Sequence, residues 1–305
     1  MKYVVLFWAV LSVANSARSQ PCCTGTGPQE LGVLGLNQTG LLGTELSTNI
    51  AQGSFDRTGR YRGLTSGQSI DSIMTVGGAY RLWIPQLQIS GQLPIHTQFR
   101  SFKNIPSKVA TGLGDIGLGL RYRVYNKDLD RRLLFQVSLL DLHSQIVFPT
   151  GRSIEDASAQ GLGADVTGEG VTAAGVGGRL VLRFFGESSI RLSGQYQSRV
   201  ATSLRLKVGD LVTARCHYDY LINLRSIIGI GLRYRHVFTP DASMNESVRY
   251  GSRRLRVVGT FIHHVAPPLW TLITRIAWDP PVDAISTNLP FAGLHTVVGL
   301  RRIFL

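Results

Sequence analysis

The dominant pattern along the chain is an alternation of apolar and non-apolar residues, in segments of roughly 10–14 residues. A period of two residues is that of a β-strand with one apolar face. The period slips near Leu139 and Leu140, which predicts a β-bulge there. Twelve strands are predicted in all. The clearest begin at Leu87, Ile116, Thr172, Ile190, Val212 and Ile228, and weaker ones cover residues 40–51, 70–82, 133–148, 253–265, 269–279 and 293–305.

The links between these segments alternate between short and long. The link at 206–210 is the exception, because it is short at a place where the alternation requires a long link. Short periplasmic turns, long outer loops and an even number of strands are typical of bacterial outer-membrane barrels. The short links lie at 83–86, 126–132, 185–188, near Arg225 and at Pro267-Pro268, and the long links lie at 52–69, 97–111, 149–170, 239–252 and 280–292.

One face of the predicted strands carries Leu, Ile, Val and aromatic residues, and the other carries Gly, Gln and Arg. A soluble barrel would turn the apolar face inward, whereas a membrane barrel turns it toward lipid and encloses a polar lumen. Alternation alone fits both arrangements. The strand count and the loop asymmetry favour the membrane form. The expected fold is therefore all-β, an antiparallel up-and-down transmembrane β-barrel of about 12 strands.

The N-terminus gives an independent signal for export. Lys2, the apolar run YVVLFWAVLSVA and the small polar residues up to Ser19 match the regions of a secretory signal peptide. We expect residues 1–19 to be removed, 20–39 to form a periplasmic segment or a plug, and 40–305 to form the barrel. Cys22 and Cys23 then lie near the new N-terminus, as incidental thiols or in one disulfide. The predicted location is the outer membrane of a bacterium, in contact with its lipid.

Composition agrees with this architecture. The chain has 34 glycines, and 17% of its residues are charged, against about 25% in ordinary soluble domains. The formal net charge is +13, but the basic residues are spread along the strands rather than clustered. No nucleic acid partner is therefore expected. No Cys or His pair has the spacing of a zinc site, so we expect neither a metal nor a cofactor.

The last predicted strand ends in Phe304 and Leu305, and its parity places Arg302 on the lipid face. Near the membrane interface an arginine on that face costs only about 0–1 kcal/mol. Aromatic residues near the strand ends predict a girdle at the two interfaces. They are Tyr80, Trp83, Tyr122, Tyr125, Tyr234, Phe238, Trp270 and Trp278.

The stretch GLGDIG from Gly112 fits the dinucleotide fingerprint G-x-G-x-x-G. That motif needs a strand before the glycines and a helix after them. The preceding SFKNIPSKVAT is polar and contains a proline, so it is interpreted as a loop, and strand alternation continues unbroken to Val124. We therefore expect a membrane strand, with Gly114 at its start on the apolar side and Gly117 and Gly119 on the inner face.

GLGDIGLGLRYRV, followed by FPTG at residues 148–151, resembles the outer-membrane proteins of the phenol meta-pathway family, often labelled simply as transporters. The sharp agreement is confined to residues 112–151. The resemblance implies a β-barrel in the outer membrane and passage of small organic molecules.

Arginines on the predicted inner face are the main candidate functional residues. Guanidinium groups stay charged at any pH and bind carboxylates and phosphates in a forked geometry, and rings of them select anions in pores. The alternative is structural, because arginine ladders can brace a wide barrel. The few acids expected beside them include Glu45. The predicted lumen and selectivity residues are Asp115, Arg121, Arg123, Arg179, Arg183, Arg191, Arg199, Arg215, Asp219, Arg233 and Arg235, with Arg275 less secure.

Catalysis has little support in the sequence. Ser138, Asp141 and His143 share a neighbourhood and His263 is followed by His264, but no G-x-S-x-G or H-E-x-x-H motif is present. We expect a channel for small solutes, with a preference for anionic or aromatic-acid compounds, and not an enzyme. The alternatives are a scaffold barrel plugged by 149–170 or 20–39, and an outer-membrane lipid hydrolase.

Overall fold

The computed structural model describes residues 38–63, 68–102, 105–126, 135–152, 166–184, 187–201, 206–223, 225–239, 247–248, 251–266, 270–283, 286–287 and 289–304. The predicted signal peptide, residues 20–37, Cys22 and Cys23 lie outside these ranges. Within the described residues, no helix has the length and hydropathy of a membrane-crossing segment.

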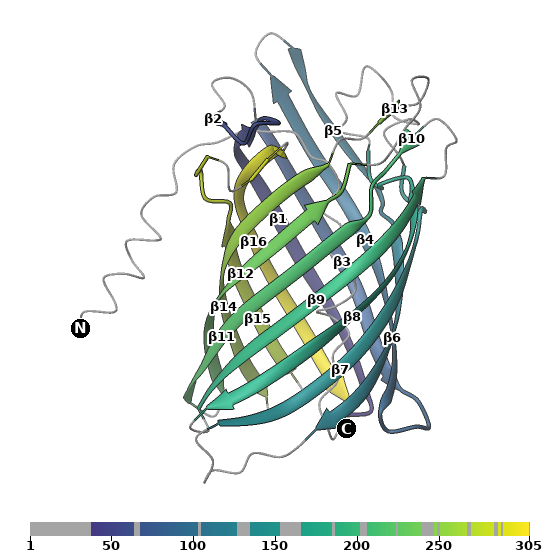
Figure 1. Cartoon of the computed structure of the whole chain (residues 1–305), viewed down its shortest axis with the longest axis vertical. Coiled ribbons are helices and arrows are strands. Elements are labelled where there is room, and N and C mark those ends of the chain that lie inside the picture. Colours follow the sequence, from purple (N-terminus) through teal and green to yellow (C-terminus); the bar gives the residue numbers. More distant parts are fainter. Residues whose placement is uncertain are drawn as a thin grey trace, which may run out of the picture.

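Twelve antiparallel strands form a closed barrel, because β1 pairs with β16 as well as with β3 (Figure 1). All twelve predicted strands are confirmed. The barrel strands, in chain order, are β1 (Gly40–Phe55), β3 (Gln68–Arg81), β4 (Leu87–Phe102), β6 (Ile116–Asn126), β7 (Phe135–Phe148), β8 (Val171–Phe184), β9 (Ser188–Ala201), β11 (Leu211–Asn223), β12 (Ser226–Val237), β14 (Ser252–Ala266), β15 (Trp270–Trp278) and β16 (Leu289–Phe304).

Burial confirms the membrane orientation of the two faces. In β6, Leu118, Leu120 and Tyr122 are exposed on the outside, whereas Arg121 and Arg123 are buried inside. The predicted bulge is confirmed close to its expected place, because the β7–β8 register shifts between Val137 and Leu139. A soluble barrel would bury the leucines and expose the arginines, so this barrel is of the inverted, transmembrane kind.

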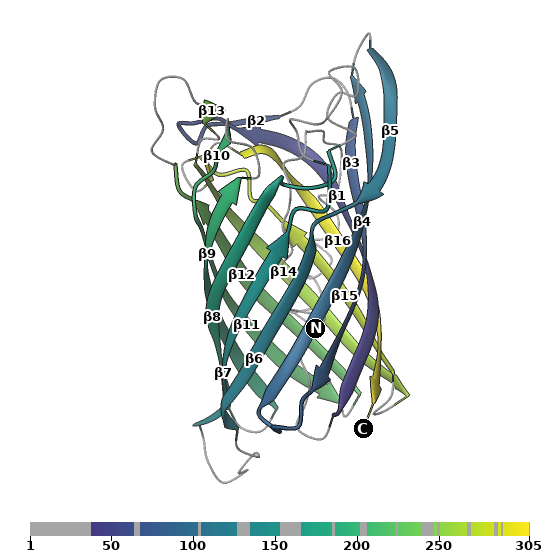
Figure 2. The ribbon, with the colours of Figure 1, turned by 90° about the vertical axis from the view of Figure 1, so that its right-hand side faces the viewer.

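The two ends of the barrel differ (Figures 1 and 2). Tight connections and the C-terminus lie at one end, where β1 begins opposite Phe304. The other end carries the shorter strands β2 (Tyr61–Gly63), β5 (Ile105–Leu113), β10 (Leu206–Lys207) and β13 (Ser247–Val248). We call these the turn end and the loop end.

Two connections differ from prediction. The expected loop at 97–111 is wrong, because β4 continues to Phe102 and β5 pairs with it as a hairpin. This hairpin reaches past the barrel wall (Figure 2), so it needs no lipid face and shows no clean alternation. The prediction of a short link at 206–210 is also wrong, because the connection is longer and runs from the end of β9 at Ala201 to the start of β11 at Leu211. The alternation of link lengths is therefore more regular than the sequence suggested.

The outer surface carries the predicted aromatic residues at both ends. Tyr80, Trp83 and Tyr122 are exposed near the turn end, and Phe238 and Trp278 are exposed near the loop end. Arg302 lies on the outside as predicted, and its guanidinium lies over two aromatic rings, 5.7 Å from the Trp270 centroid and 5.3 Å from the Phe304 centroid. Cation–π contacts of this kind lower the cost of an arginine at the membrane interface.

Candidate functional site

A row of inward side chains crosses the barrel wall along the direction of the interstrand hydrogen bonds. Strand register sets it, because residues directly opposite each other in adjacent strands point to the same face. We call it the arginine row. Its members, one from each barrel strand from β6 to β14, are Arg123, Asp141, Arg179, Ser193, Arg215, Arg233 and Arg256.

Asp141 neutralises the β6–β8 part of the row. Its carboxylate is fully buried and forms ion pairs with Arg179 at 2.5 Å, Arg123 at 3.5 Å and Arg121 at 3.8 Å. One carboxylate therefore joins three strands through three guanidinium groups. This supports the bracing interpretation for Arg121, Arg123 and Arg179.

Two further acids brace the barrel nearer the turn end. Asp219 accepts two hydrogen bonds from Arg191, at 2.6 and 2.8 Å. Glu45 pairs with Arg275 at 3.3 Å and with Arg301 at 3.9 Å. Both acids were predicted to face the lumen, and the structure places them there.

The expectation of few lumen acids is wrong. Asp71, Asp141, Glu169 and Asp279 also point inward, each paired with at least one arginine. Sequence parity missed Glu169 because it lies outside the strands, and Asp141 because the parity of β7 changes at its bulge. Asp71 and Asp279 lie at the ends of the predicted strands 70–82 and 269–279, where the alternation is weaker. Arginines still outnumber acids on the described inner face.

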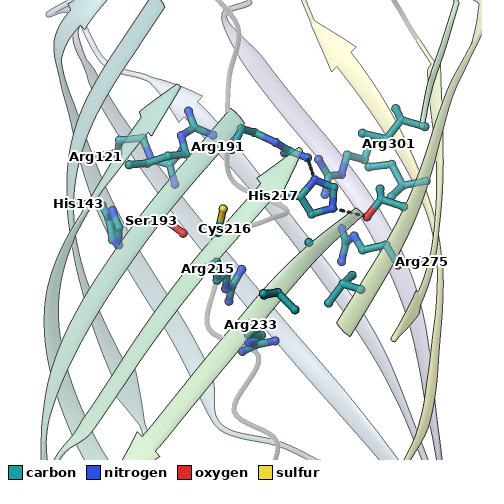
Figure 3. A pocket seen from close by; sticks show the side chains of 17 residues that line it. Arg121, His143, Arg191, Ser193, Arg215, Cys216, His217, Arg233, Arg275 and Arg301 are labelled. Carbon is teal, nitrogen blue, oxygen red and sulfur yellow. Dashed lines mark hydrogen bonds between the residues drawn. The ribbon is translucent and has the colours of Figure 1, made fainter. Parts of the chain in front are cut away.

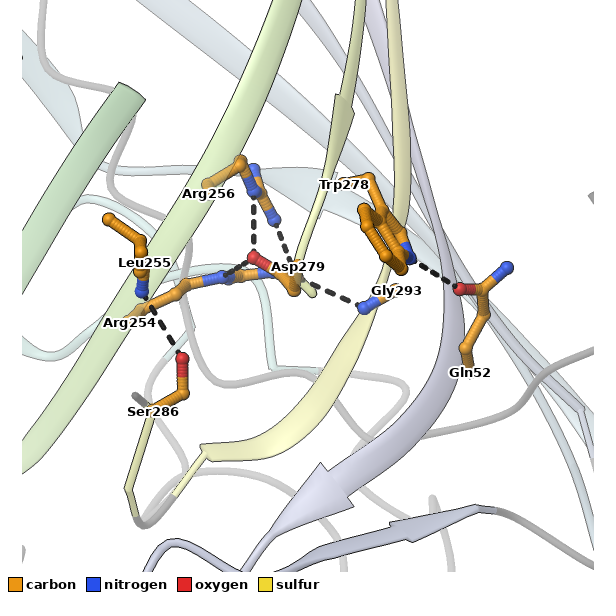
Figure 4. Close-up of polar contacts among 8 residues, drawn as sticks. All are labelled: Gln52, Arg254, Leu255, Arg256, Trp278, Asp279, Ser286 and Gly293. Atoms are coloured by element: carbon orange, nitrogen blue, oxygen red, sulfur yellow. Dashed lines mark hydrogen bonds and ion pairs between the residues drawn. The ribbon is translucent and has the colours of Figure 1, made fainter. Parts of the chain in front are cut away.

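Asp279 forms a second buried cluster with arginines (Figure 4). It pairs with Arg254 and Arg256, the latter at 3.1 Å, and accepts a hydrogen bond from the Gly293 amide at 3.0 Å. These contacts join β14, the end of β15 and β16. Arg254 and Arg256 were not predicted, because the doublet in SRRLR leaves the inward parity ambiguous. Arg100, which pairs with Asp71 at 3.0 Å, was also missed.

Asp115 holds two separate connections together at the loop end. It lies between β5 and β6 and accepts hydrogen bonds from the amides of Gly151 at 3.0 Å and Glu169 at 2.7 Å. Burial raises the pKa of its carboxyl to about 6, although the Gly151 amide and Arg199 act in the opposite direction. The Thr150 hydroxyl donates to the Gly114 carbonyl at 2.7 Å. The sequence stretches GLGD and FPTG therefore meet in space.

Gly114 itself corrects a prediction. It is buried between β5 and β6, and a side chain there would collide with His96 and Pro94 of β4. The strand is thus interrupted at Gly114 and Asp115 rather than beginning there with an apolar face. The preceding residues 105–113 form β5 and not the expected loop.

Residues 166–170, which we call the mouth segment, contact inward side chains from separate parts of the wall. The Val166 carbonyl accepts a hydrogen bond from Gln98 of β4 at 2.5 Å. Glu169 pairs with Arg199 of β9 and with Arg235 of β12, the latter at 3.3 Å. Arg199 and Arg235, both predicted lumen residues, therefore hold this segment over the loop end of the lumen.

The lumen contains a cavity of about 300 Å³ below this level (Figure 3). Among its described lining residues are seven arginines and two histidines, and none of these described residues is an acid. Arg121, Arg179, Arg191, Arg215 and Arg233 reach it from one side, and Arg275 and Arg301 reach it from β15 and β16. Arg183, in contrast, is exposed at the turn end of β8 and does not line it.

Glycines on the inner face let long side chains cross neighbouring strands. His217 of β11 passes over β12 and bonds through Nε2 to Thr260 Oγ1 of β14 at 3.0 Å. A Cβ at Gly231 would lie 2.5 Å from the His217 ring. Gly175 and Gly177 of β8 likewise leave room for the side chains of Gln197 and His143, so these inner-face glycines are a packing requirement.

The residues considered for catalysis have other partners. The Ser138 hydroxyl donates to the Val181 carbonyl at 3.2 Å, and Asp141 is held by arginines. His263 Nδ1 lies 3.0 Å from the hydroxyl of Ser226, which is buried, and His264 Nδ1 lies 2.9 Å from that of Thr271. Within the described residues, no cluster of His, Cys, Asp and Glu could hold a metal ion.

No family model and no curated protein sequence matches the chain. Among solved structures, an outer membrane channel from Pseudomonas putida is similar, with a TM-score of 0.67, 14% identity and coverage of 92% of this chain and 100% of that one. The β domain of the Bordetella autotransporter BrkA is similar with a TM-score of 0.51 and 13% identity, covering 87% of this chain and 100% of that one. The transport unit of the autotransporter AIDA-I from Escherichia coli is similar with a TM-score of 0.50 and 8% identity, covering 91% of this chain and 95% of that one.

These similarities show the fold, a β-barrel of the outer-membrane kind. With the apolar outside and charged inside of this chain, they place it in a bacterial outer membrane. The resemblance to the phenol meta-pathway family stays a prediction.

Proposed function

We propose that this barrel is a passive channel for small anionic solutes. The observation that carries the proposal is the cavity, where seven arginines gather and none of the described lining residues is an acid. Rings of arginine or lysine are how pores for anions and phosphates are built. The structural relative from Pseudomonas putida is named an outer membrane channel, which supports transport as the general role.

Bracing and selectivity coexist in this arrangement. Arg121 and Arg179 share the single Asp141 carboxylate with Arg123 and still line the cavity, so the excess positive charge of this cluster acts on a passing solute. A barrel of about 12 strands has a lumen between the filled eight-stranded kind and the open sixteen-stranded porins. In such a narrow lumen, fixed charge controls which ions pass.

Purified protein in planar bilayers tests the proposal. The expected result is discrete single-channel currents carried mainly by chloride. Silent bilayers under all voltages, with folded protein shown by its heat-dependent gel mobility, would favour the plugged scaffold instead. Lipid hydrolysis by the same preparation, abolished by Ser226→Ala, would favour the hydrolase.

The mouth segment gives a prediction about access to the lumen. Glu169→Gln removes the charge that holds this segment to Arg199 and Arg235. If the closed state loses about 1 kcal/mol of stabilisation, a two-state equilibrium shifts about fivefold. The open-to-closed ratio of single channels should therefore rise by about that factor.

The matched control for the mouth segment is Glu187→Gln at the turn end, where Glu187 accepts a hydrogen bond from Tyr220 at 3.3 Å. It removes the same charge far from the mouth segment and should leave gating unchanged. Equal gating in both variants and the unmodified protein would mean that Glu169 does not hold the segment across the path.

A further inference from the structure

The cavity is lined by arginines from several strands and by a small apolar group on β14 and β15. Arg215 and Arg233 face it from β11 and β12, and Figure 3 shows them side by side. Val258, Ile262 and Ile273 line it from β14 and β15. Ile262 and Ile273 are directly opposite in register, and Val258 and Ile262 are half-buried. The lumen therefore holds a small apolar surface within a charged interior.

Arg215 and Arg233 are directly opposite each other in the β11–β12 register. Like charges in this position destabilise a sheet. The register continues to Arg256 on one side and to Ser193 on the other. An anion placed between the two guanidinium groups would offset their like charge further and accept forked hydrogen bonds from both.

A cavity of about 300 Å³ is at the lower limit of the volumes that hold small-molecule ligands. Chloride or phosphate would use the arginines but leave the apolar residues in contact with water. A carboxylate attached to a compact apolar body would contact both kinds of side chain, its charged end the arginines and its body the apolar residues.

We propose that this cavity is a binding site for small monocarboxylates with an apolar body. The carboxylate lies between Arg215 and Arg233, and the body packs on Val258, Ile262 and Ile273. This inference rests on the proposed channel function and deepens it, because it gives the lumen a saturable site on the transport path.

Equilibrium binding to the folded full chain in detergent tests the site without requiring conduction. The probe is benzoate, compared by titration calorimetry with acetate, which lacks the apolar body, and with benzamide, which lacks the charge. We expect benzoate to bind at least about tenfold more tightly than either, because each loses one of the two sets of contacts. Equal affinity for benzoate and acetate, or no benzoate binding, would overturn the proposal.

Two variants locate the site. Arg215→Gln with Arg233→Gln keeps two polar side chains in the row, with folding checked by heat-dependent gel mobility. It should weaken benzoate binding by at least about tenfold. Ile262→Ser with Ile273→Ser should weaken benzoate but leave acetate unchanged. Arg183→Gln, at the exposed turn end, is the matched control and should bind benzoate normally. Benzoate binding unaffected by either double change would place the site elsewhere.

The two proposals fail in different ways. A protein that conducts chloride but shows no block by benzoate keeps the channel function and loses this site. A protein that binds benzoate through Arg215 and Arg233 but never conducts keeps the site and loses the channel function.

Discussion

Replacing Arg215 and Arg233 together with glutamate is expected to lower the chloride-to-potassium permeability ratio by about fivefold or more. The two residues face the cavity from adjacent strands, and the change alters four unit charges there. A unit charge 4 Å from an ion is worth about 1 kcal/mol even in bulk water, which is about a fivefold effect, and more where the lumen is narrow. The measurement is the reversal potential of the variant under a salt gradient.

The control for this selectivity change is Arg57→Glu with Arg60→Glu. These residues lie in the exposed connection after β1, outside the lumen. The net charge of the protein changes equally, but the permeability ratio should stay within about twofold of the original, because exposed charges beyond about 8 Å are screened at physiological salt. Equal effects of both pairs would mean that total charge, and not the cavity, sets selectivity.

Asp141→Ala is expected to destabilise the folded barrel by about 3–5 kcal/mol, the cost of leaving buried partner charges uncompensated. Asp141 is fully buried and is paired with Arg121, Arg123 and Arg179. The free energy of unfolding, measured by urea titration in lipid vesicles, checks the value.

Asp56→Ala is the control for this stability change. Asp56 lies in the loop after β1 and pairs with Arg62 at 3.6 Å on an exposed surface. Exposed ion pairs contribute about 0–1 kcal/mol, so this variant should lose little stability. If Asp141→Ala unfolds at the same urea concentration as the unmodified protein, the arginines are not braced by this carboxylate.

The barrel could be predicted because its two strongest constraints act locally. Lipid outside and charge inside impose a period of two on every strand, so Ile116 to Val124 identifies both a strand and its faces without any long-range contact. Where lipid imposes nothing, prediction failed. The β4–β5 hairpin reaches past the wall, and its polar residues with Pro106 look like a loop although they pair as strands.

The candidate site was predicted in part. Parity along β11 and β12 placed Arg215, Arg233 and Arg235 inside. The predicted up-and-down barrel makes β11 and β12 neighbours, but parity does not fix their register, so the opposition of Arg215 and Arg233 could not be foreseen. The triple pairing of Asp141 was also hidden, because it combines β6, β7 and β8 and a bulge that alters inward parity.

Acids outside the strands were the least predictable part. Glu169 lies at the end of one long connection and Asp279 at the start of another, and only the folded chain brings them to their partners. These partners are Arg199, Arg235, Arg254 and Arg256. Their contribution changes the view of the lumen from a ring of free positive charge to a braced wall with a local excess. That excess is concentrated at the cavity.

The reversal potential of the unmodified protein tests the central claim most directly. A planar bilayer with a tenfold potassium chloride gradient separates the two ions, because an ideal anion or cation channel gives about 59 mV of opposite sign. We predict a reversal potential with the sign of chloride selectivity. It should shift toward zero when benzoate binds to the cavity, and when Arg215 and Arg233 are replaced by glutamate. A potential with the sign of potassium selectivity would contradict the account.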